Sequence, residues 1–576
     1  MEQGTARKIV ITVMFLLVSP LLADNPESAF WQEPSPITVE LSRGDAAVTP
    51  GRFILAALLY SGVAHGDIPR YQDQIHSLLD RLTEAYGDRP RDARLAEALL
   101  EELHRSVLTR YRETATELDL LIDDGLFNCV SSSILYAIVL DAFGFPFSAV
   151  RTSDHAFIKV LAGGTYYDVE TTSRYGFDPG RKKEFRDEFG SMTGFVYTPP
   201  SNYSDRIDIS RTEFLSLILQ NRITIFMQHK QYEHALAPGI EFFTLRGDKE
   251  SLEMLVGIVQ RVGLSALERK QYAQGLLIMD RAVSTFRDFE QFEETRRQYI
   301  LDWSRRLVDA GSYEEAASSA RTALTAGKIP EEDYRRLLIF RFHREAEAVS
   351  RDTRRGPGAA LDILARARRE LGGEESLLEA EHVYARNFVL TTAEQGDVEK
   401  AFSLLNLFTS DGRLTQDSFR ELYVFLTLKK AESSARRHDY LEAIQAIEEG
   451  LSLLGEEKKL HEGLAVYMHN YALRLIEEKR FSDAKTFLDG ERCRTALDPA
   501  DRGELIRYYY QSAADALFGA GKTDAALELL ETGMRELPGD RALLKVYEVK
   551  IHNLLVDLVR GKEFDRAHDL VRRGLT

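Results

Sequence analysis

Cysteine is scarce in this chain, which has only Cys129 and Cys493 among 576 residues. Two cysteines cannot build a disulfide framework or a cysteine-rich zinc site. The histidines show no metal-ligand spacing such as H-E-x-x-H, and no glycine-rich phosphate loop is found in the sequence. The sequence therefore predicts neither a metal nor a cofactor.

An excess of positive charge is also missing, because 74 Lys and Arg stand against 91 Asp and Glu for a formal net charge of −17. This balance argues against nucleic acid as a partner. Long apolar runs are absent after the N-terminus, so no other membrane-spanning segment is expected. At the N-terminus, Arg7 and Lys8 precede the apolar stretch IVITVMFLLV, and the small Ala23 precedes a polar segment.

These N-terminal features predict a secretory signal peptide over residues 1–23. An uncleaved anchor is the alternative, because the bulky Leu21 occupies the third position before the expected cleavage site. We expect an exported protein of the bacterial periplasm or cell envelope.

The second half of the chain contains a repeat. From about residue 230, an aromatic residue recurs three positions before a small one, as in QYEHAL, SYEEAA, DYLEAI and EFDRAH. The small residues, or their weaker counterparts, follow one another at steps of 40 to 44 residues: Ala235, Gly275, Ala316, Ala360, Ala401, Ala443, Ala484, Ala526 and Ala567. Amphipathic stretches flank each position, and a small residue lets two helices cross closely. The spacing predicts helical hairpins stacked into a solenoid.

This pattern resembles the tetratricopeptide repeat, whose turn carries the same aromatic-x-x-Ala signature. The period exceeds the family's 34 residues by about seven, which predicts helices about one turn longer each. The resemblance implies an all-α solenoid of about nine repeats over residues 201–576 that binds a protein or peptide ligand. A capping box at Ser210 and Glu213 predicts its start. Cys493 lies near an expected helix end in this array and is predicted to be structural.

The other cysteine stands where a loop is expected to become a helix. Cys129 follows Asn128, a favoured N-cap residue, and precedes a periodic apolar run that ends at Gly144. At the first helical position, free backbone N–H groups and the helix dipole favour a thiolate. The three serines at residues 131–133 are expected to keep this turn small enough for a substrate to approach.

Alternating apolar and polar residues then predict strands over residues 147–153, 155–162 and 165–172, the last two joined by a turn at Gly163 and Gly164. His155 opens the second of these strands. A thiolate nucleophile needs a base, and the base needs an orienting acid. A helix-start cysteine followed by a histidine and carboxylates on adjacent strands supplies all three.

Three segments, FNCVSSSILYAIVLDAFGFP, HAFIKV and YYDVETT, resemble the transglutaminase-like superfamily, whose Cys-His-Asp core is shared with papain-type proteases. The resemblance covers about residues 50–245. It implies an α+β core over residues 111–200 behind a helical lead-in over residues 24–110. It further implies Cys129 as nucleophile, His155 as base and Asp168 as orienting acid. Phe157 stands where the family has tryptophan, and the Cys129 backbone N–H is the one oxyanion donor that the sequence suggests.

The strand register raises the question of which carboxylate is the orienting acid. If Gly163 and Gly164 form a two-residue turn, Asp168 faces Lys159, four residues from His155. At ~3.3 Å per residue, this separation is about 13 Å, too far for a hydrogen bond. Glu170 lies on the same face and is the alternative acid.

Two functions follow from these features. The leading hypothesis is an exported cysteine-dependent acyl-transfer enzyme, an amide hydrolase or transglutaminase-like protein, that acts on peptides or proteins docked by the solenoid. The alternative is a non-catalytic periplasmic scaffold whose transglutaminase-like domain only binds.

Overall fold

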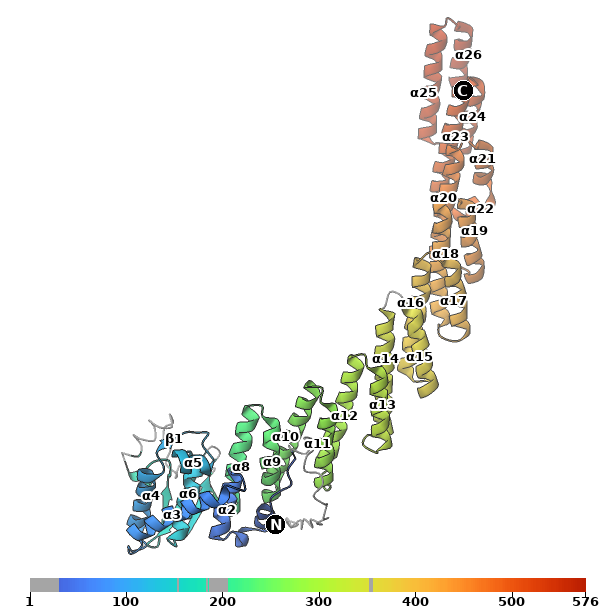
Figure 1. Ribbon diagram of the computed structural model, residues 1–576. Helices are drawn as coiled ribbons and strands as arrows, with labels where there is room; N and C mark the ends of the chain where they lie inside the picture. The colour runs from blue at the N-terminus through green and yellow to red at the C-terminus, as the bar shows by residue number, and fades with distance from the viewer. Residues whose placement is uncertain (1–30, 153–154, 183–184, 186–205, 352–355, 576) are drawn as a thin grey trace, which may run out of the picture. The chain divides into compact units, whose positions relative to one another are not determined.

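The chain divides into two compact units in a computed structural model, which describes residues 31–152, 155–182, 185, 206–351 and 356–575 (Figure 1). Unit 1 is Met1–Leu307 with Glu314–Tyr334, and unit 2 is Val308–Tyr313 with Arg335–Thr576. The predicted signal peptide and the expected boundary at residues 200 and 201 lie outside the described residues. Among the described helices, none combines the length and the apolar character that a membrane crossing requires.

Unit 1 begins with short helices around one buried helix, α6. These elements are α1 (Pro36–Leu41), α2 (Pro50–Tyr60), α3 (Ile68–Tyr86), α4 (Ala93–Ser106), β1 (Arg110–Tyr111), α5 (Leu118–Asp124), β2 (Leu126–Phe127) and α6 (Cys129–Ala142). Every α6 residue from Val130 to Leu140 is buried, and α2, α4, α5 and α8 pack around it. A helix that is apolar on all sides has to be covered on all sides.

A four-stranded antiparallel sheet packs beside α6, with the strand order β5-β4-β3-β6. Its strands are β3 (Phe147–Arg151), β4 (Ala156–Ala162), β5 (Thr165–Val169) and β6 (Ile207–Ile209). Gly163 and Gly164 have φ of 58° and 83°, which allows a two-residue turn. Lys159 pairs with Asp168, so the tight-turn register expected from the sequence is confirmed.

Helical hairpins make up the described chain from Arg211 onward. Their first helices are α8 (Arg211–Gln228), α10 (Lys249–Glu268), α12 (Glu290–Asp309), α14 (Glu331–Ser350), α16 (Glu375–Glu394), α18 (Gln416–Arg436), α20 (Lys458–Glu477), α23 (Pro499–Gly519) and α25 (Arg541–Arg560). Their second helices are α9 (Tyr232–Arg246), α11 (Tyr272–Thr285), α13 (Tyr313–Thr325), α15 (Gly356–Leu371), α17 (Val398–Ser410), α19 (Tyr440–Leu454), α21 (Phe481–Asp489), α24 (Thr523–Glu536) and α26 (Phe564–Leu575), with the short α22 (Glu491–Ala496) after α21. The predicted tetratricopeptide-like solenoid is confirmed.

The repeated small residue occupies one position in these hairpins. It is the fourth residue of every second helix except α15, where Ala360 is the fifth, and it is buried in all nine helices. The predicted capping box that opens α8 is also present, since Ser210 and Glu213 each bind the other's backbone N–H. Cys493 lies buried in α22, as its predicted structural role requires.

The extra length of the repeat falls on one helix of each pair. A 34-residue period with two turns of about three residues leaves about 14 residues for each helix. Here α10 and α20 have 20 residues each, whereas α11 has 14 and α17 has 13. The expectation that both helices gain about one turn is therefore wrong. The additional residues of the repeat lie in the first helix of each pair.

One hydrophobic core runs through unit 1 from Ile37 to Tyr299, and it joins the short helices, the sheet and the first hairpins. Phe53 of α2 meets Phe214 of α8 at 6.2 Å between ring centroids. The Ser35 backbone N–H before α1 donates to the carboxylate of Glu241 in α9, at 2.8 Å. The first hairpin is therefore packed directly against the elements around α6.

Gly275 is the one repeat position in which glycine replaces alanine, and its surroundings leave no room for a methyl group. A Cβ there would lie 2.6 Å from Tyr299 Cζ and 2.9 Å from Ala266 Cβ. Tyr299 is held in place because its hydroxyl donates to the Tyr272 carbonyl at 2.8 Å. We expect Gly275→Ala to lower the free energy of unfolding by about 1–3 kcal/mol, through overpacking.

Gly257, inside neighbouring α10, is the matched control because a Cβ there would meet no heavy atom within 4 Å. Gly257→Ala is expected to raise the free energy of unfolding by about 0.5–1 kcal/mol, since alanine favours the helix. Urea unfolding followed by tryptophan fluorescence measures both, as Trp31 and Trp303 both belong to unit 1. Effects of the same sign would contradict the close crossing at Gly275.

Candidate functional site

The start of α6 is fixed by its N-cap residue, as the sequence predicts. The side-chain oxygen of Asn128 accepts from the backbone N–H groups of Val130 and Ser131 at 2.9 and 3.0 Å, and the Ser131 hydroxyl accepts from the Asn128 N–H at 3.0 Å. Cys129 is thus the first residue of α6 and is only partly buried. It therefore stands at the N-terminal, positive end of the helix dipole.

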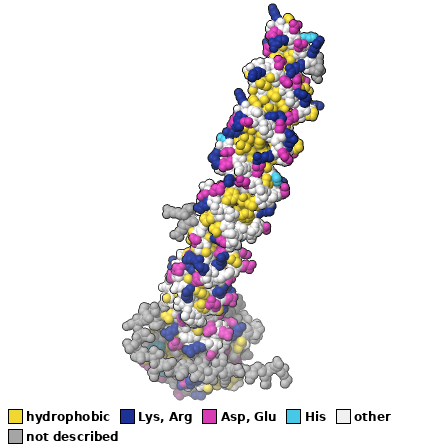
Figure 2. All heavy atoms as spheres, turned by 90° about the vertical axis from the view of Figure 1, so that its right-hand side faces the viewer, with side chains coloured by type: hydrophobic (Ala, Val, Ile, Leu, Met, Phe, Trp, Pro, Cys, Tyr) yellow, Lys and Arg dark blue, Asp and Glu magenta, His cyan; other side chains and the backbone are white. Residues whose placement is uncertain are grey.

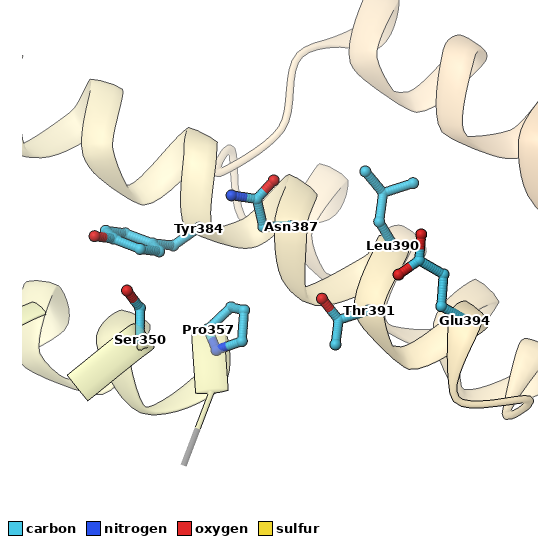
Figure 3. A pocket seen from close by; sticks show the side chains of 7 residues that line it. All are labelled: Ser350, Pro357, Tyr384, Asn387, Leu390, Thr391 and Glu394. Carbon is cyan, nitrogen blue, oxygen red and sulfur yellow. The ribbon is translucent and has the colours of Figure 1, made fainter. Parts of the chain in front are cut away.

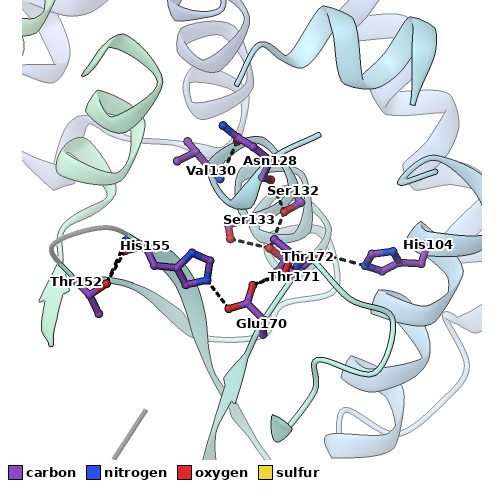
Figure 4. Close-up of polar contacts among 10 residues, drawn as sticks. All are labelled: His104, Asn128, Val130, Ser132, Ser133, Thr152, His155, Glu170, Thr171 and Thr172. Atoms are coloured by element: carbon purple, nitrogen blue, oxygen red, sulfur yellow. Dashed lines mark hydrogen bonds and ion pairs between the residues drawn. The ribbon is translucent and has the colours of Figure 1, made fainter. Parts of the chain in front are cut away.

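His155 lies directly before β4 and points toward Glu170 (Figure 4). Its Nε2 atom and Glu170 Oε2 form a hydrogen bond. The backbone holds the histidine in place, because the His155 N–H donates to Thr152 Oγ1 at 3.1 Å and the Thr152 N–H donates to the His155 carbonyl at 2.9 Å. Cys129 also acts on this imidazole, since its charge and a hydrogen bond to it are among the causes that raise the pKa of His155.

Glu170 follows the end of β5, and only 4% of its side chain is exposed. Its second oxygen, Oε1, accepts from the Thr172 hydroxyl at 2.8 Å and from the Thr172 N–H at 3.3 Å. Both oxygens of this buried carboxylate therefore have donors, as burial of a charge requires. The carboxylate is held in a fixed orientation toward the imidazole.

The prediction that Asp168 lies beside His155 is wrong. Asp168 pairs with Arg206 through two hydrogen bonds of 2.6 and 2.9 Å, and it faces Lys159 across the hairpin. The reason is the two-residue turn, whose register keeps Asp168 well along the strand from His155. Glu170 is two residues nearer to the open end of the hairpin and occupies the place expected for the acid.

The electrostatics of the imidazole follow from its neighbours. Burial alone would lower the pKa of His155, but the negative charges of Glu170 and Cys129 and the hydrogen bonds to both raise this pKa well above its ordinary value. An imidazolium between a carboxylate and a sulfur atom stabilises the thiolate. The three side chains can therefore provide a nucleophile, a proton carrier and an orienting acid.

Two features of this site were missed in the sequence. The serines at residues 131–133 do not open the first turn to a substrate, because all three are completely buried and bound to other protein groups. Ser132 and Ser133 each contact Thr171, whose carbonyl in turn meets His104 of α4 (Figure 4). Three serines in an apolar helix, together with the Thr-Thr-Ser run at residues 171–173, are a signal that could have revealed this contact.

Tyr111 is the other missed residue. β1 and β2 pair in parallel so that Tyr111 stands opposite Phe127, two residues before Cys129, and the two rings meet edge to face at 6.0 Å. Burial, followed by the charges of Cys129, Glu113 and Glu170, raises the pKa of Tyr111. The Tyr111 ring thus lies against β2, the strand that leads to Cys129.

A hollow of about 340 Å³ lies in unit 2, separate from these residues (Figure 3). Tyr384, Asn387 and Thr391 of α16 line it, together with Ser350 and Pro357. The last two flank residues 352–355, which lie outside the described part of the chain, so we assign this hollow no role. Among the described residues, no group of His, Cys, Asp and Glu is arranged to hold a metal ion.

No protein-family model matches the chain, and no curated protein matches it. Among solved structures, it is similar to the TPR domain of P58(IPK), with 14% identity, 62% of this chain and 98% of the other covered, and a TM-score of 0.15. It is also similar to the APC/C hetero-tetramer Cut9-Hcn1, with 12% identity, coverage of 94% and 99%, and a TM-score of 0.13. A third likeness is to Naa15/Naa10 bound to HypK, with 11% identity, coverage of 91% and 80%, and a TM-score of 0.12. At these TM-scores the likenesses carry no argument, and the assignment of the solenoid rests on the hairpins themselves.

Proposed function

We propose that this protein is a repeat protein whose solenoid binds a protein or peptide, and that Cys129 performs acyl transfer on an amide of that partner. The observation that carries this proposal is the position of His155 between Cys129 and a buried, fully hydrogen-bonded Glu170. The order of a helix-start cysteine, a histidine directly before one strand and a carboxylate directly after the next supports the resemblance to the transglutaminase-like superfamily. In this chain, the third member is glutamate instead of aspartate.

The proposed reaction begins with attack of the Cys129 thiolate on an amide carbonyl carbon. The carbonyl electron pair moves to oxygen, and the Cys129 backbone N–H is the candidate donor to this oxyanion. When the intermediate collapses, the C–N bond breaks, and the leaving amine takes the proton carried by His155. The product is a thioester on Cys129. Water or a second amine, deprotonated by His155, attacks this thioester and releases the thiolate.

A non-catalytic scaffold is the second candidate, and the extent of the solenoid supports it. The hairpins begin at Arg211 and continue to the end of the described chain. On the face of unit 2 in Figure 2, hydrophobic side chains gather in patches among acidic and basic ones. Such patches suit a protein or peptide partner better than nucleic acid or an anionic membrane.

Residues 1–23 alone support the proposal that the protein is exported to the periplasm or cell envelope.

Thiol labelling separates the two candidates. If Cys129 is activated, iodoacetamide at about pH 6.5 should label it at least about tenfold faster than Cys493 in the same folded protein. Cys493 is the internal control, since it is completely buried and burial raises its pKa. His155→Ala should remove most of the advantage of Cys129. Equally slow labelling of both cysteines in the unchanged protein would favour the scaffold.

A further inference from the structure

Thr171 connects the segment that carries the acid to the helix that carries the thiol. It directly follows Glu170 and is completely buried. Its Oγ1 atom lies 2.8 Å from Ser132 Oγ and 2.8 Å from Ser133 Oγ, both in the first turns of α6. Its carbonyl oxygen lies 3.0 Å from Nε2 of His104, which must donate, since a carbonyl only accepts. Thr171 is therefore bound to α6 on one side and to α4 on the other (Figure 4).

The direction of these hydrogen bonds is determined by counting protons. The Ser132 hydroxyl lies 2.7 Å from the Asn128 carbonyl, to which it can only donate. Each hydroxyl has one proton, so Ser132 must accept from Thr171, and Thr171 in turn must accept from Ser133. A single chain of donors thus runs from Ser133 through Thr171 and Ser132 to the carbonyl of Asn128. It starts in α6, passes through Thr171 in the acid's own segment, and ends at the residue before Cys129.

We propose that Thr171 is a positioning residue that fixes the Cys129 sulfur relative to the His155–Glu170 pair. This inference rests on the proposed function, because it matters only if the thiol is activated. Glu170 and Thr171 are adjacent in the chain, as are Asn128 and Cys129, so the hydrogen-bond chain sets the spacing of the two halves of the site. A displacement of about 1 Å in such a site can cost about a hundredfold in rate.

The test compares Thr171→Val, which keeps the shape and removes the hydroxyl, with Thr171→Ser, which keeps the hydroxyl. Iodoacetamide alkylation of Cys129 is measured across pH 6 to 9 in the full chain, together with the melting temperature. We expect Thr171→Val to slow alkylation about tenfold near pH 6.5 and to move the pH of half-maximal rate upward. Thr171→Ser should restore the profile of the unchanged protein.

Thr38→Val is the matched control for lost stability. Thr38 is also completely buried in unit 1, and its hydroxyl lies 2.9 Å from Ser35 Oγ and 2.8 Å from Tyr60 Oη. Thr38→Val should lower the melting temperature about as much as Thr171→Val does, and it should leave the alkylation profile of Cys129 unchanged. Should Thr171→Val fail to fold, Ser132→Ala interrupts the same chain by a smaller change and should move the profile in the same direction.

Three results would overturn the inference. An unchanged profile in Thr171→Val, with rapid labelling of Cys129 in the unchanged protein, refutes the positioning role alone. An equal effect of Thr38→Val assigns the change to general loosening of unit 1. Slow labelling of Cys129 in the unchanged protein refutes the proposed function, and the positioning role falls with it.

Discussion

Glu170→Gln is expected to slow the alkylation of Cys129 by about tenfold to a hundredfold near pH 6.5, whereas Asp168→Asn should change it less than about twofold. Each substitution removes one negative charge with little change in shape. Of these two carboxylates, Glu170 is the one that forms a hydrogen bond with His155, and its charge contributes to the raised pKa of that imidazole. Without this charge, His155 is less often the cation that stabilises the thiolate.

Asp168→Asn acts elsewhere in the hairpin. It weakens the paired hydrogen bonds with Arg206, and because both side chains are about a quarter exposed, the loss should be at most about 1 kcal/mol of stability. Alkylation rates of the two variants at several pH values, with melting temperatures, measure the difference. Greater slowing by Asp168→Asn than by Glu170→Gln would mean that Asp168, and not Glu170, is the acid that orients His155. No slowing by either would leave Cys129 without a working triad.

The contrast between these carboxylates shows what local sequence could predict at the site. Asn128 determines the start of α6, and Gly163 with Gly164 determines the turn, since both features depend on residues next to one another in the chain. From the turn, the register follows by counting, and the register places Glu170 near His155. The assignment of Asp168 came from resemblance alone, and the register already opposed it.

Contacts between distant segments were beyond the reach of such reasoning. The sequence places serines on α6 and threonines after β5, but it does not say which face of either segment meets the other. His104 contributes from α4, far earlier in the chain, and no local pattern links it to Thr171. Similarly, Tyr111 reaches the site through a two-residue strand pair, which is too short to leave a periodic signal.

For the solenoid, too, local features could be predicted from the sequence and the other features could not. The period of aromatic and small residues predicted hairpins and the buried position of each small residue, because both depend on local spacing. The period could not reveal how the added length is shared between two helices. Nor could it show what covers the open end of the first repeat, which in this chain is the set of elements around α6.

That shared core leads to the largest stability effect we expect. Phe214 of α8 is completely buried and packs near Phe53, while α8 also contacts α6. Phe214→Ala should lower the stability of unit 1 by about 3–5 kcal/mol, from lost burial and the cavity left behind. Because one core joins the first hairpin to α6, the backbone amides of α6 should lose protection from hydrogen exchange by about a hundredfold or more.

Phe408→Ala is the matched control, since Phe408 is almost completely buried in α17 of unit 2. It should unfold part of unit 2 more easily and leave both the exchange of α6 and the fluorescence of Trp31 and Trp303 unchanged. Peptide-resolved hydrogen exchange and urea titrations of both variants provide the measurements. If Phe214→Ala loosened only the hairpins and left α6 protected, the solenoid and the thiol site would be independent folding units. Joint loosening would mean that the site depends on the first repeat for its stability, so that a partner bound there could act on Cys129 through the shared core.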